Sequence, residues 1–394
     1  MHVDIAAWLN LAIRWLHLTA GIAWIGSSFY FVWLDMHLKP PAQGEASGEV
    51  WSVHGGGFYH NQKYQVAPST MPAELHWFKW EAYFTWLSGF SLLVLVYYVG
   101  ASNFLIDPAK AALSVPAAIA IGLASIVLSW FVYDLLCRST LGSNNLLLGI
   151  VWFVYLLMAA IVLDSLFNSR GAYLHIGAII GSVMVGNVFF VIIPNQRIVV
   201  ADLVAGRTPD PALGAAAKQR SLHNNYMTLP VLFIMISHHY PMTYGAERPW
   251  LVLALLGLTG VAVRHVFNLR NRAQKTGPAM AVAVAMALVS VTYVTLEKGM
   301  AGTATGGATR YYADIQPILA THCTGCHSQH PTNTAFASPP LGVMLDSYDH
   351  AAPAAARVKA MAVDTETMPL GNTTHMTKAD REKLGAWIAG GAQR

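Results

Sequence analysis

Two cysteines and a histidine stand together in the run Cys323-Thr-Gly-Cys326-His327. Two thiols in this spacing, followed at once by an imidazole, are the groups that covalent attachment of a c-type haem requires. The thiols bond the vinyl groups, and the histidine ligates the iron. A redox dithiol or half of a zinc site would share the Cys-x-x-Cys spacing, but the adjoining histidine and the lack of further cysteines nearby disfavour both. The sequence therefore predicts one covalent haem c with His327 as a ligand of its iron.

A methionine downstream is the expected second ligand of the same iron. Met368 lies in the run Thr-Met-Pro-Leu-Gly, where the proline stiffens the loop that presents the sulfur. Met361 is the alternative, but it lies in an alanine-rich run that reads as helical, and a single methionine often only fills a core. We expect His327 and Met368 to be the two metal ligands.

The residues around this motif predict a small helical domain. An opening helix is expected from Tyr311 to His322, with Ile315 and Leu319 on one face. A closing helix is expected from Thr377 to Ala389, with Thr377 as its N-cap and an aspartate three residues on. Together with the haem motif, this pattern resembles a class I cytochrome c over residues 310–394.

The chain before this domain has the composition of a membrane protein. It repeatedly runs through apolar stretches near the length of about 20 residues that a helix needs to cross a bilayer. The charged fraction is 11%, which a mostly buried bundle explains better than a soluble domain. The expected spans are 6–34, 77–99, 114–136, 145–164, 172–194, 226–240, 249–268 and 278–297. The sequence thus predicts an all-α, polytopic transmembrane bundle of about eight spans over residues 1–298.

Positive charges predict how this bundle is oriented, because lysine and arginine near span ends favour the cytoplasmic side. The loops after the odd spans contain Lys39, Lys63, Arg138, Arg197, Arg207, Lys218, Arg220, Arg270, Arg272 and Lys275, and those after the even spans contain only Lys110, Arg170 and Arg248. This places both chain ends outside. The sequence therefore predicts a multi-pass protein of a bacterial inner membrane with a periplasmic cytochrome domain, joined to the bundle by a flexible Gly/Ala/Thr linker at 299–309.

The first span contains residues that could hold a second haem. Arg14 and His17 lie three residues apart on one helix face, and the same face continues through Gly21. A glycine one turn from an imidazole leaves room for a flat macrocycle. The run Arg-Trp-Leu-His-Leu-Thr-Ala-Gly-Ile-Ala-Trp-Ile-Gly is similar to the first helix of membrane proteins that carry b-type haem. The expected ligand is His17, and the further ligand is left open among His175, His238 and His239, each of which could instead hydrogen-bond a neighbouring helix.

A second polar group is expected on the cytoplasmic side, where it could line a cavity. Its members are His54, His60, Tyr64, Gln65, Glu74, His76, Lys79, Glu81, His223, Asn224, Asn225, Arg264 and His265. The run from His54 to His60 contains three glycines and predicts a flexible loop, either an ordinary turn or one that approaches a ligand closely. It lacks the Gly-Lys-Ser/Thr ending of a phosphate-binding loop, so nucleotide is not expected.

The whole chain resembles the bacterial membrane-bound urate oxidases, also called urate hydroxylases. The resemblance rests on the eight spans, the loop from His54 to Tyr64, the stretch from Glu74 to Phe90 and the C-terminal cytochrome c pattern. It implies oxidation of urate to 5-hydroxyisourate without direct use of oxygen. It also implies that electrons leave through the haem c to a respiratory acceptor such as a soluble cytochrome or a terminal oxidase.

Roles for individual residues follow from what urate chemistry would need. Arg264 or Arg14 could hold the anion, His76 or Glu81 could act as general base, and Trp80 could stack on the ring. Two other functions stay open at this stage, a membrane subunit that oxidises quinol and a purine transporter with a fused cytochrome. The net charge of +4 is dispersed, so nucleic acid is not an expected partner.

Overall fold

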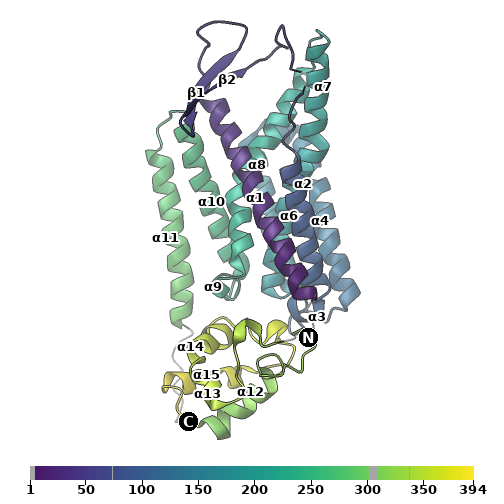
Figure 1. The fold of residues 1–394 in the computed structure, drawn as a ribbon. Helices are drawn as coiled ribbons and strands as arrows, with labels where there is room; N and C mark the ends of the chain where they lie inside the picture. The colour runs from purple at the N-terminus through teal and green to yellow at the C-terminus, as the bar shows by residue number, and fades with distance from the viewer. Residues whose placement is uncertain (1–4, 73, 301–308, 337) are drawn as a thin grey trace.

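The computed structural model describes residues 5–72, 74–300, 309–336 and 338–394, with the side chains of 297–300 excepted. The chain forms a long helical bundle with a small helical domain beneath one end (Figure 1). The bundle contains α1 (Ile5–His37), β1 (Gly48–His54), β2 (Gly57–Lys63), α2 (Trp80–Leu93), η1 (Val94–Tyr98), α3 (Ala101–Phe104), α4 (Val115–Arg138), η2 (Thr140–Ser143), α5 (Asn145–Leu166), α6 (Ser169–Gly186), η3 (Asn187–Ile192), α7 (Ile193–Val204), α8 (Pro211–Ser237), α9 (Pro241–Tyr244), α10 (Pro249–Asn271) and α11 (Gly277–Met300). The small domain contains η4 (Tyr311–Ile315), α12 (Gln316–His322), η5 (Pro340–Gly342), α13 (Tyr348–Ala351), α14 (Ala355–Val358), η6 (Lys359–Val363), η7 (Leu370–Asn372) and α15 (Lys378–Ala389).

Six helical segments of the described chain are long and apolar enough to cross a membrane, which agrees with a membrane protein. They are Ile5–His37, Val115–Arg138, Asn145–Leu166, Ser169–Val204, Pro249–Asn271 and Gly277–Leu296. The expected total of eight is not confirmed. The other two expected spans are helical, but α2 has only 14 residues before the π-helical turn η1, and the first half of α8 carries many polar residues.

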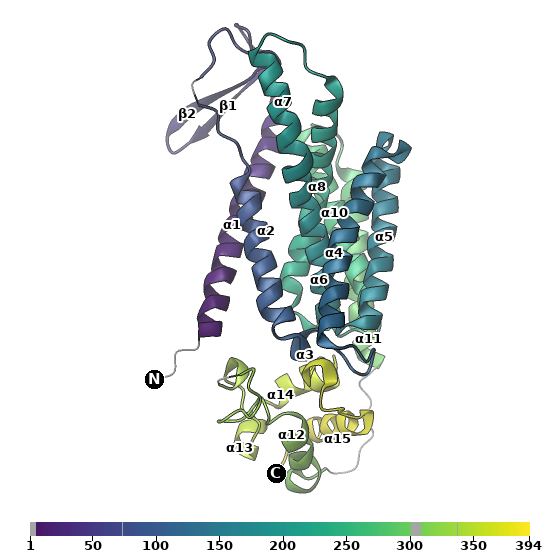
Figure 2. The same ribbon diagram turned by 90° about the vertical axis from the view of Figure 1, so that its right-hand side faces the viewer.

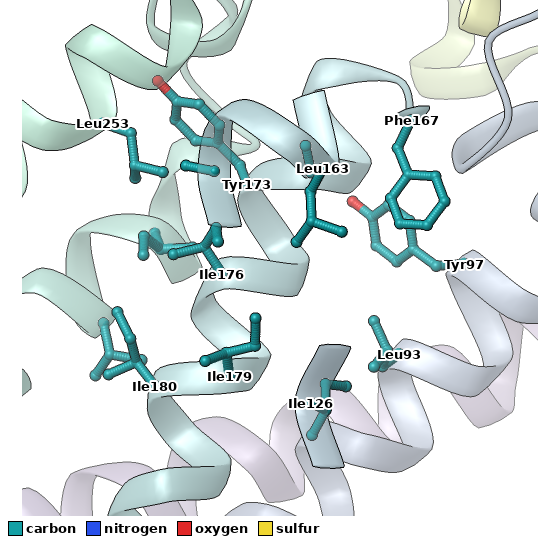
Figure 3. Packing of buried hydrophobic residues seen from close by; sticks show 14 of the residues in the cluster. Leu93, Tyr97, Ile126, Leu163, Phe167, Tyr173, Ile176, Ile179, Ile180 and Leu253 are labelled. Carbon is teal, nitrogen blue, oxygen red and sulfur yellow. The ribbon is translucent and has the colours of Figure 1, made fainter. Parts of the chain in front are cut away.

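The centre of the bundle is the helix α6, which packs against α4, α5 and α8. Two thirds of the most apolar window of the segment Ser169–Val204 is buried, against less than a quarter in each of the other five candidate spans. Ile176, Ile179 and Ile180 of α6 point into the hydrophobic core together with Ile126 and Leu163 from the neighbouring helices (Figure 3). This central helix fixes the positions of the others.

The one departure from an all-α fold in the described residues is the hairpin β1–β2. Its strands pair antiparallel from Gly48 with Lys63 to His54 with Gly57. Gly55 and Gly56 form the turn with φ of +58° and +81°, the left-handed conformation that a two-residue hairpin turn needs. The run from His54 to His60 is therefore a tight turn followed by a strand, which agrees with the expected alternative of an ordinary turn and not with a flexible loop. Both views show the hairpin at the end of the bundle opposite the C-terminal domain (Figures 1 and 2).

The C-terminal domain has the two helices that its sequence predicts. The opening helix runs through η4 and α12 and buries Tyr311, Ile315 and Leu319. The closing helix α15 begins after Thr377, whose hydroxyl accepts the backbone N–H of Asp380 while the Asp380 carboxylate accepts that of Thr377. The expected linker at 299–309 lies largely outside the described residues, and α11 continues to Met300.

The C-terminal domain sits directly against the loops at its end of the bundle. Gly371 has a φ of +58°, and any side chain there would overlap the carbonyl oxygen of Ile106, just after α3. Phe336 meets Phe104 edge to face, with ring centroids 6.2 Å apart. The α3 segment therefore forms a seat for the C-terminal domain.

A buried polar network joins four elements of the bundle. Arg220 of α8 donates to the carboxylate of Asp134 on α4 at 2.7 Å and to Asn187 of η3 at 3.2 Å. Asn187 donates to Asn224 at 2.8 Å, and Asn224 donates to a carbonyl of α6 at 2.9 Å. Because Arg220 is only 3% exposed, its charge depends on these partners.

Replacing Asp134 by asparagine should lower the thermal unfolding temperature of the detergent-purified protein clearly. Removing one partner of a buried ion pair costs about 3–5 kcal/mol, because the other charge is left buried without compensation. Arg138→Gln is the matched control, since Arg138 also binds Asp134 but its side chain is 70% exposed, where an ion pair contributes about 0–1 kcal/mol. Scanning fluorimetry of both variants would contradict this account if their unfolding temperatures fell equally.

Candidate functional site

The predicted haem-attachment residues lie in a turn directly after α12. The backbone N–H of His327 donates to the carbonyl of Cys323 at 2.8 Å, so the motif closes into one helical turn. The His327 Nδ1 donates to the carbonyl of Val343 at 3.0 Å. Since a carbonyl can only accept, the proton is on Nδ1, and Nε2 remains available as a metal ligand.

The protonation states of the two thiols and the imidazole in this turn follow from their burial. Cys323 and Cys326 are free thiols. Burial raises the pKa of Cys323 to about 12 and also raises the pKa of Cys326, while burial lowers the pKa of His327. At neutral pH the thiols are therefore protonated and the imidazole is neutral. Over the described residues, these side chains do not belong to a cluster of three or more metal-ligating groups.

The two methionines that could complete the site differ in what their sulfur atoms contact. Thr367 directs its hydroxyl to the Met361 sulfur at 3.9 Å. No such contact involves the Met368 sulfur among the described residues, and Met368 packs against the hydrophobic core of the domain. Its carbonyl accepts from Arg381 at 2.7 Å, which holds the backbone of the loop. The free Nε2, the free thiols and this thioether fit a c-type haem.

A cavity of about 530 Å³ lies in the half of the bundle nearer the hairpin. It is bounded by α1, the segment before α2, η3 with α7, and α8. His76 and Trp77 form part of its wall, with Ser28, Gln196 and Asn224 supplying further polar groups. Its size and its mostly apolar lining with a few polar groups are typical of a small-molecule site.

A buried arginine that has no carboxylate partner in the described part of the chain lies beside this cavity. Arg264 of α10 is 5% exposed, and its Nε donates to Asn225 at 3.0 Å. Its guanidinium lies 3.7 Å from the centre of the Phe29 ring. The side-chain nitrogen of Asn268 also donates to Oδ1 of Asn225 at 2.8 Å. The side-chain nitrogen of Asn225 and the side-chain oxygen of Asn268 are buried and have no hydrogen-bond partner among the described residues.

The arginine and the cavity are joined through two pairs of neighbouring residues. Ser28 and Asn224 line the cavity, and the residues that follow them, Phe29 and Asn225, contact Arg264. A buried cation in an apolar bundle, surrounded by unpaired amide groups, is a site that an anion with hydrogen-bonding edges would satisfy.

The structure brings together only part of the polar group that the sequence predicts. His76 and Asn224 line the cavity, and Asn225 and Arg264 lie behind its wall without lining it. Glu81 lies in the first turn of α2 and is not a lining residue either. Three other members have partners away from the cavity: His60 bonds Glu49 in the hairpin, His223 bonds Tyr133, and His265 bonds Tyr226. Trp80, which was expected to stack on the substrate, is 56% exposed and does not line the cavity. His54, Tyr64, Gln65, Glu74 and Lys79 are not among the lining residues.

Residues that sequence reasoning missed are Phe29, Asn268 and Trp77. Asn268 follows Arg264 by four residues and therefore shares its helix face, which is a signal that the sequence contained. Trp77 lines the cavity, whereas Trp80, the tryptophan expected to stack on the substrate, does not. Nothing in the sequence pointed to Phe29, because its role depends on how α1 crosses α10.

His17 lies in the other half of the bundle, toward the C-terminal domain. Its Nδ1 donates to the carbonyl of Thr85 at 2.9 Å, so Nε2 is available. Its ring lies against Gly89 of α2 so closely that a Cβ there would overlap it. His175 is fully buried, with Nδ1 bonded to Gly171 at 2.8 Å and Nε2 at 3.2 Å from the Tyr98 hydroxyl.

Comparison with known proteins identifies the family to which the chain belongs. Neither the curated proteins nor the solved structures compared with the chain match it. A family model described as urate oxidase N-terminal matches residues 3–296, which is well over half of the chain and includes every residue of the cavity and of the Arg264 site. The bundle, its cavity and its buried arginine therefore belong to a member of the urate oxidase N-terminal family.

Proposed function

We propose that this protein oxidises urate to 5-hydroxyisourate at the cavity beside Arg264 and passes the electrons to a haem c bound by the C-terminal domain. The family supports urate as the substrate. The single observation that carries the site is the buried Arg264, which has no carboxylate partner among the described residues and faces unpaired amides. Urate at neutral pH is a planar anion with carbonyl and N–H edges, so it satisfies both groups.

The reaction removes two electrons and two protons from urate and water together. Water forms a bond to C5 of the purine, and the oxygen of 5-hydroxyisourate comes from that water. A residue that accepts a proton at the cavity is therefore required, together with an outlet for electrons.

Five residues have roles in this proposal. Arg264 holds the anion, with Asn225 and Asn268 offering a donor and an acceptor to the ring edges. Trp77 provides a flat apolar wall, and His76 in the same wall accepts the proton released as water attacks. Glu81 is outside the cavity lining, which favours His76 over Glu81 as the base.

The C-terminal domain provides the electron outlet. When bound, a c-type haem takes up electrons one at a time. Cys323 and Cys326 hold it, and His327 and Met368 ligate its iron. The lysines and arginines near the hairpin end favour that end as cytoplasmic, so the C-terminal domain faces the periplasm of a bacterial inner membrane, where a soluble cytochrome or a terminal oxidase can collect the electrons.

Anaerobic addition of urate to the purified, oxidised protein should reduce the haem c and consume urate in the absence of oxygen. Optical spectra of the haem and of urate, recorded together, measure both changes. The control is a quinol added in place of urate, which should leave the haem oxidised. Haem that dithionite reduces but urate does not would overturn the proposed function, and reduction by quinol alone would assign the electrons to quinol oxidation.

Arg264→Gln should lower kcat/KM for urate by about 10- to 100-fold, because a hydrogen bond to a charged group contributes about 1.5–3 kcal/mol. Most of the change should appear in KM, since the anion is held in the ground state as well. Arg270→Gln is the matched control, because Arg270 lies on the same helix but is exposed. Equal kinetics for the two variants would remove Arg264 from the site.

Met368→Ala should lower the reduction potential of the haem, because an axial methionine raises it relative to other ligands. Met361→Ala should leave the potential unchanged, since its sulfur is engaged by Thr367. Potentiometric titration of both variants distinguishes the two methionines. The opposite result would assign the ligand to Met361.

A further inference from the structure

A second group of positive charges without carboxylates lies at the end of the bundle that faces the C-terminal domain. Arg14 of α1 and Arg170 of α6 are close enough to interact electrostatically, and both also act on Tyr97 of η1. Neither arginine forms a salt bridge with a carboxylate in the described part of the chain. The Nε of Arg170 is buried without a hydrogen-bond partner. Arg14 donates to Asn10 at 3.2 Å and Arg170 hydrogen-bonds Tyr97, so both guanidinium groups have neutral partners, and an anionic ligand would supply the missing counter-charge.

Two imidazoles with available nitrogens lie beside these arginines. His17 is one turn from Arg14 along α1, and its Nδ1 is committed to the Thr85 carbonyl, so its Nε2 is free. His238, directly after α8, interacts with both Arg14 and Arg170, and its ring bonds the backbone of Met235. The Nε2 of His238 is buried and has no partner.

The other histidines of this half of the bundle are less suited to bind a ligand. His175 has both ring nitrogens engaged, by Gly171 and Tyr98. His239 is exposed and stacks on His238 with centroids 3.8 Å apart. His17 and His238 are therefore the pair whose free nitrogens, fixed by a hydrogen bond on the other side of each ring, have the arrangement found in metal-ligating histidines.

We infer that His17 and His238 are the axial ligands of a non-covalently bound haem whose propionates are held by Arg14 and Arg170. The two imidazoles match the two axial positions of the iron, and the two propionates match the two guanidinium groups that form no salt bridge among the described residues. Close packing of the His17 ring on Gly89 fixes its plane against α2. No other common cofactor combines two imidazole-binding positions with two carboxylates.

The position of this site gives it a connection to the C-terminal domain. Arg170 lies over the ring of Phe104 at 5.8 Å, and Phe104 contacts Phe336 of the C-terminal domain. A haem clamped by Arg170 lies beside the surface on which that domain is seated. In this respect the inference rests on the proposed function, because such a haem would take electrons one at a time from the cavity and hand them to the haem c. Binding of the haem requires no urate.

Haem analysis of the full-length protein tests the inference without any measurement of urate oxidation. Acidified acetone removes non-covalent haem and leaves covalent haem c in the protein pellet, so the pyridine haemochrome spectra of the two fractions count each kind. We expect about one extractable b-type haem for each covalent haem, in native membranes and after purification. Only covalent haem in both preparations would overturn the inference.

Substitutions identify the ligands. His17→Ala and His238→Ala should each reduce extractable haem at least tenfold. The covalent haem should be unchanged, which shows that the C-terminal domain of each variant has folded and bound its haem c. His239→Ala is the matched control and should retain the extractable haem. Full extractable haem in either ligand variant would remove that histidine from the site.

A milder substitution covers the case in which alanine disturbs folding. His238→Met should retain haem but replace the electron paramagnetic resonance signal of a bis-histidine iron with that of a histidine–methionine iron. An unchanged signal would exclude His238 as a ligand. Arg14→Gln should change the reduction potential of the extractable haem, and no change would exclude it from the propionate clamp.

Discussion

An arginine inside an apolar helix bundle needs a counter-charge or hydrogen-bond acceptors, because hydrocarbon offers neither. Arg220 meets this need through Asp134 and Asn187, and so ties α8 to α4 and η3. Asn187 in turn bonds Asn224, which lines the cavity. The contacts that compensate one buried charge therefore also hold one wall of the cavity in place. Because η3 continues the central helix α6, the same contacts anchor the element against which α4, α5 and α8 pack.

The same constraint singles out the places where the protein does not supply its own compensation. Arg264 has amides and an aromatic ring around it but no carboxylate within the described residues. Arg14 and Arg170 lie together at the other end in the same condition. In the two proposals these positions are completed by anions that arrive from outside the chain, a purine at one end and haem propionates at the other.

The C-terminal domain contacts one end of the bundle, so the cavity and the inferred haem site can be ordered by their distance from it. The cavity lies toward the hairpin, and His17 and His238 lie toward the opposite end. The C-terminal domain lies at that opposite end (Figure 2) and contacts it through Ile106 and Phe104. An electron released at the cavity would have to travel much of the length of the bundle to reach His327. A carrier between the two would shorten each step, which is the physical reason for the position of the inferred haem.

Local patterns in the sequence determined the elements of the C-terminal domain, the helical character of the bundle and the attachment motif, because spacing along the chain fixes which side chains share a turn or a face. The cap at Thr377 and the turn from Cys323 to His327 are of this kind. Contacts between distant segments were decided only by the tertiary structure. The choice of Trp77 over Trp80, the pairing of Phe29 with Arg264 and the hairpin at Gly55 depend on how helices cross and strands pair, and packing of that kind leaves no periodic signal in one chain.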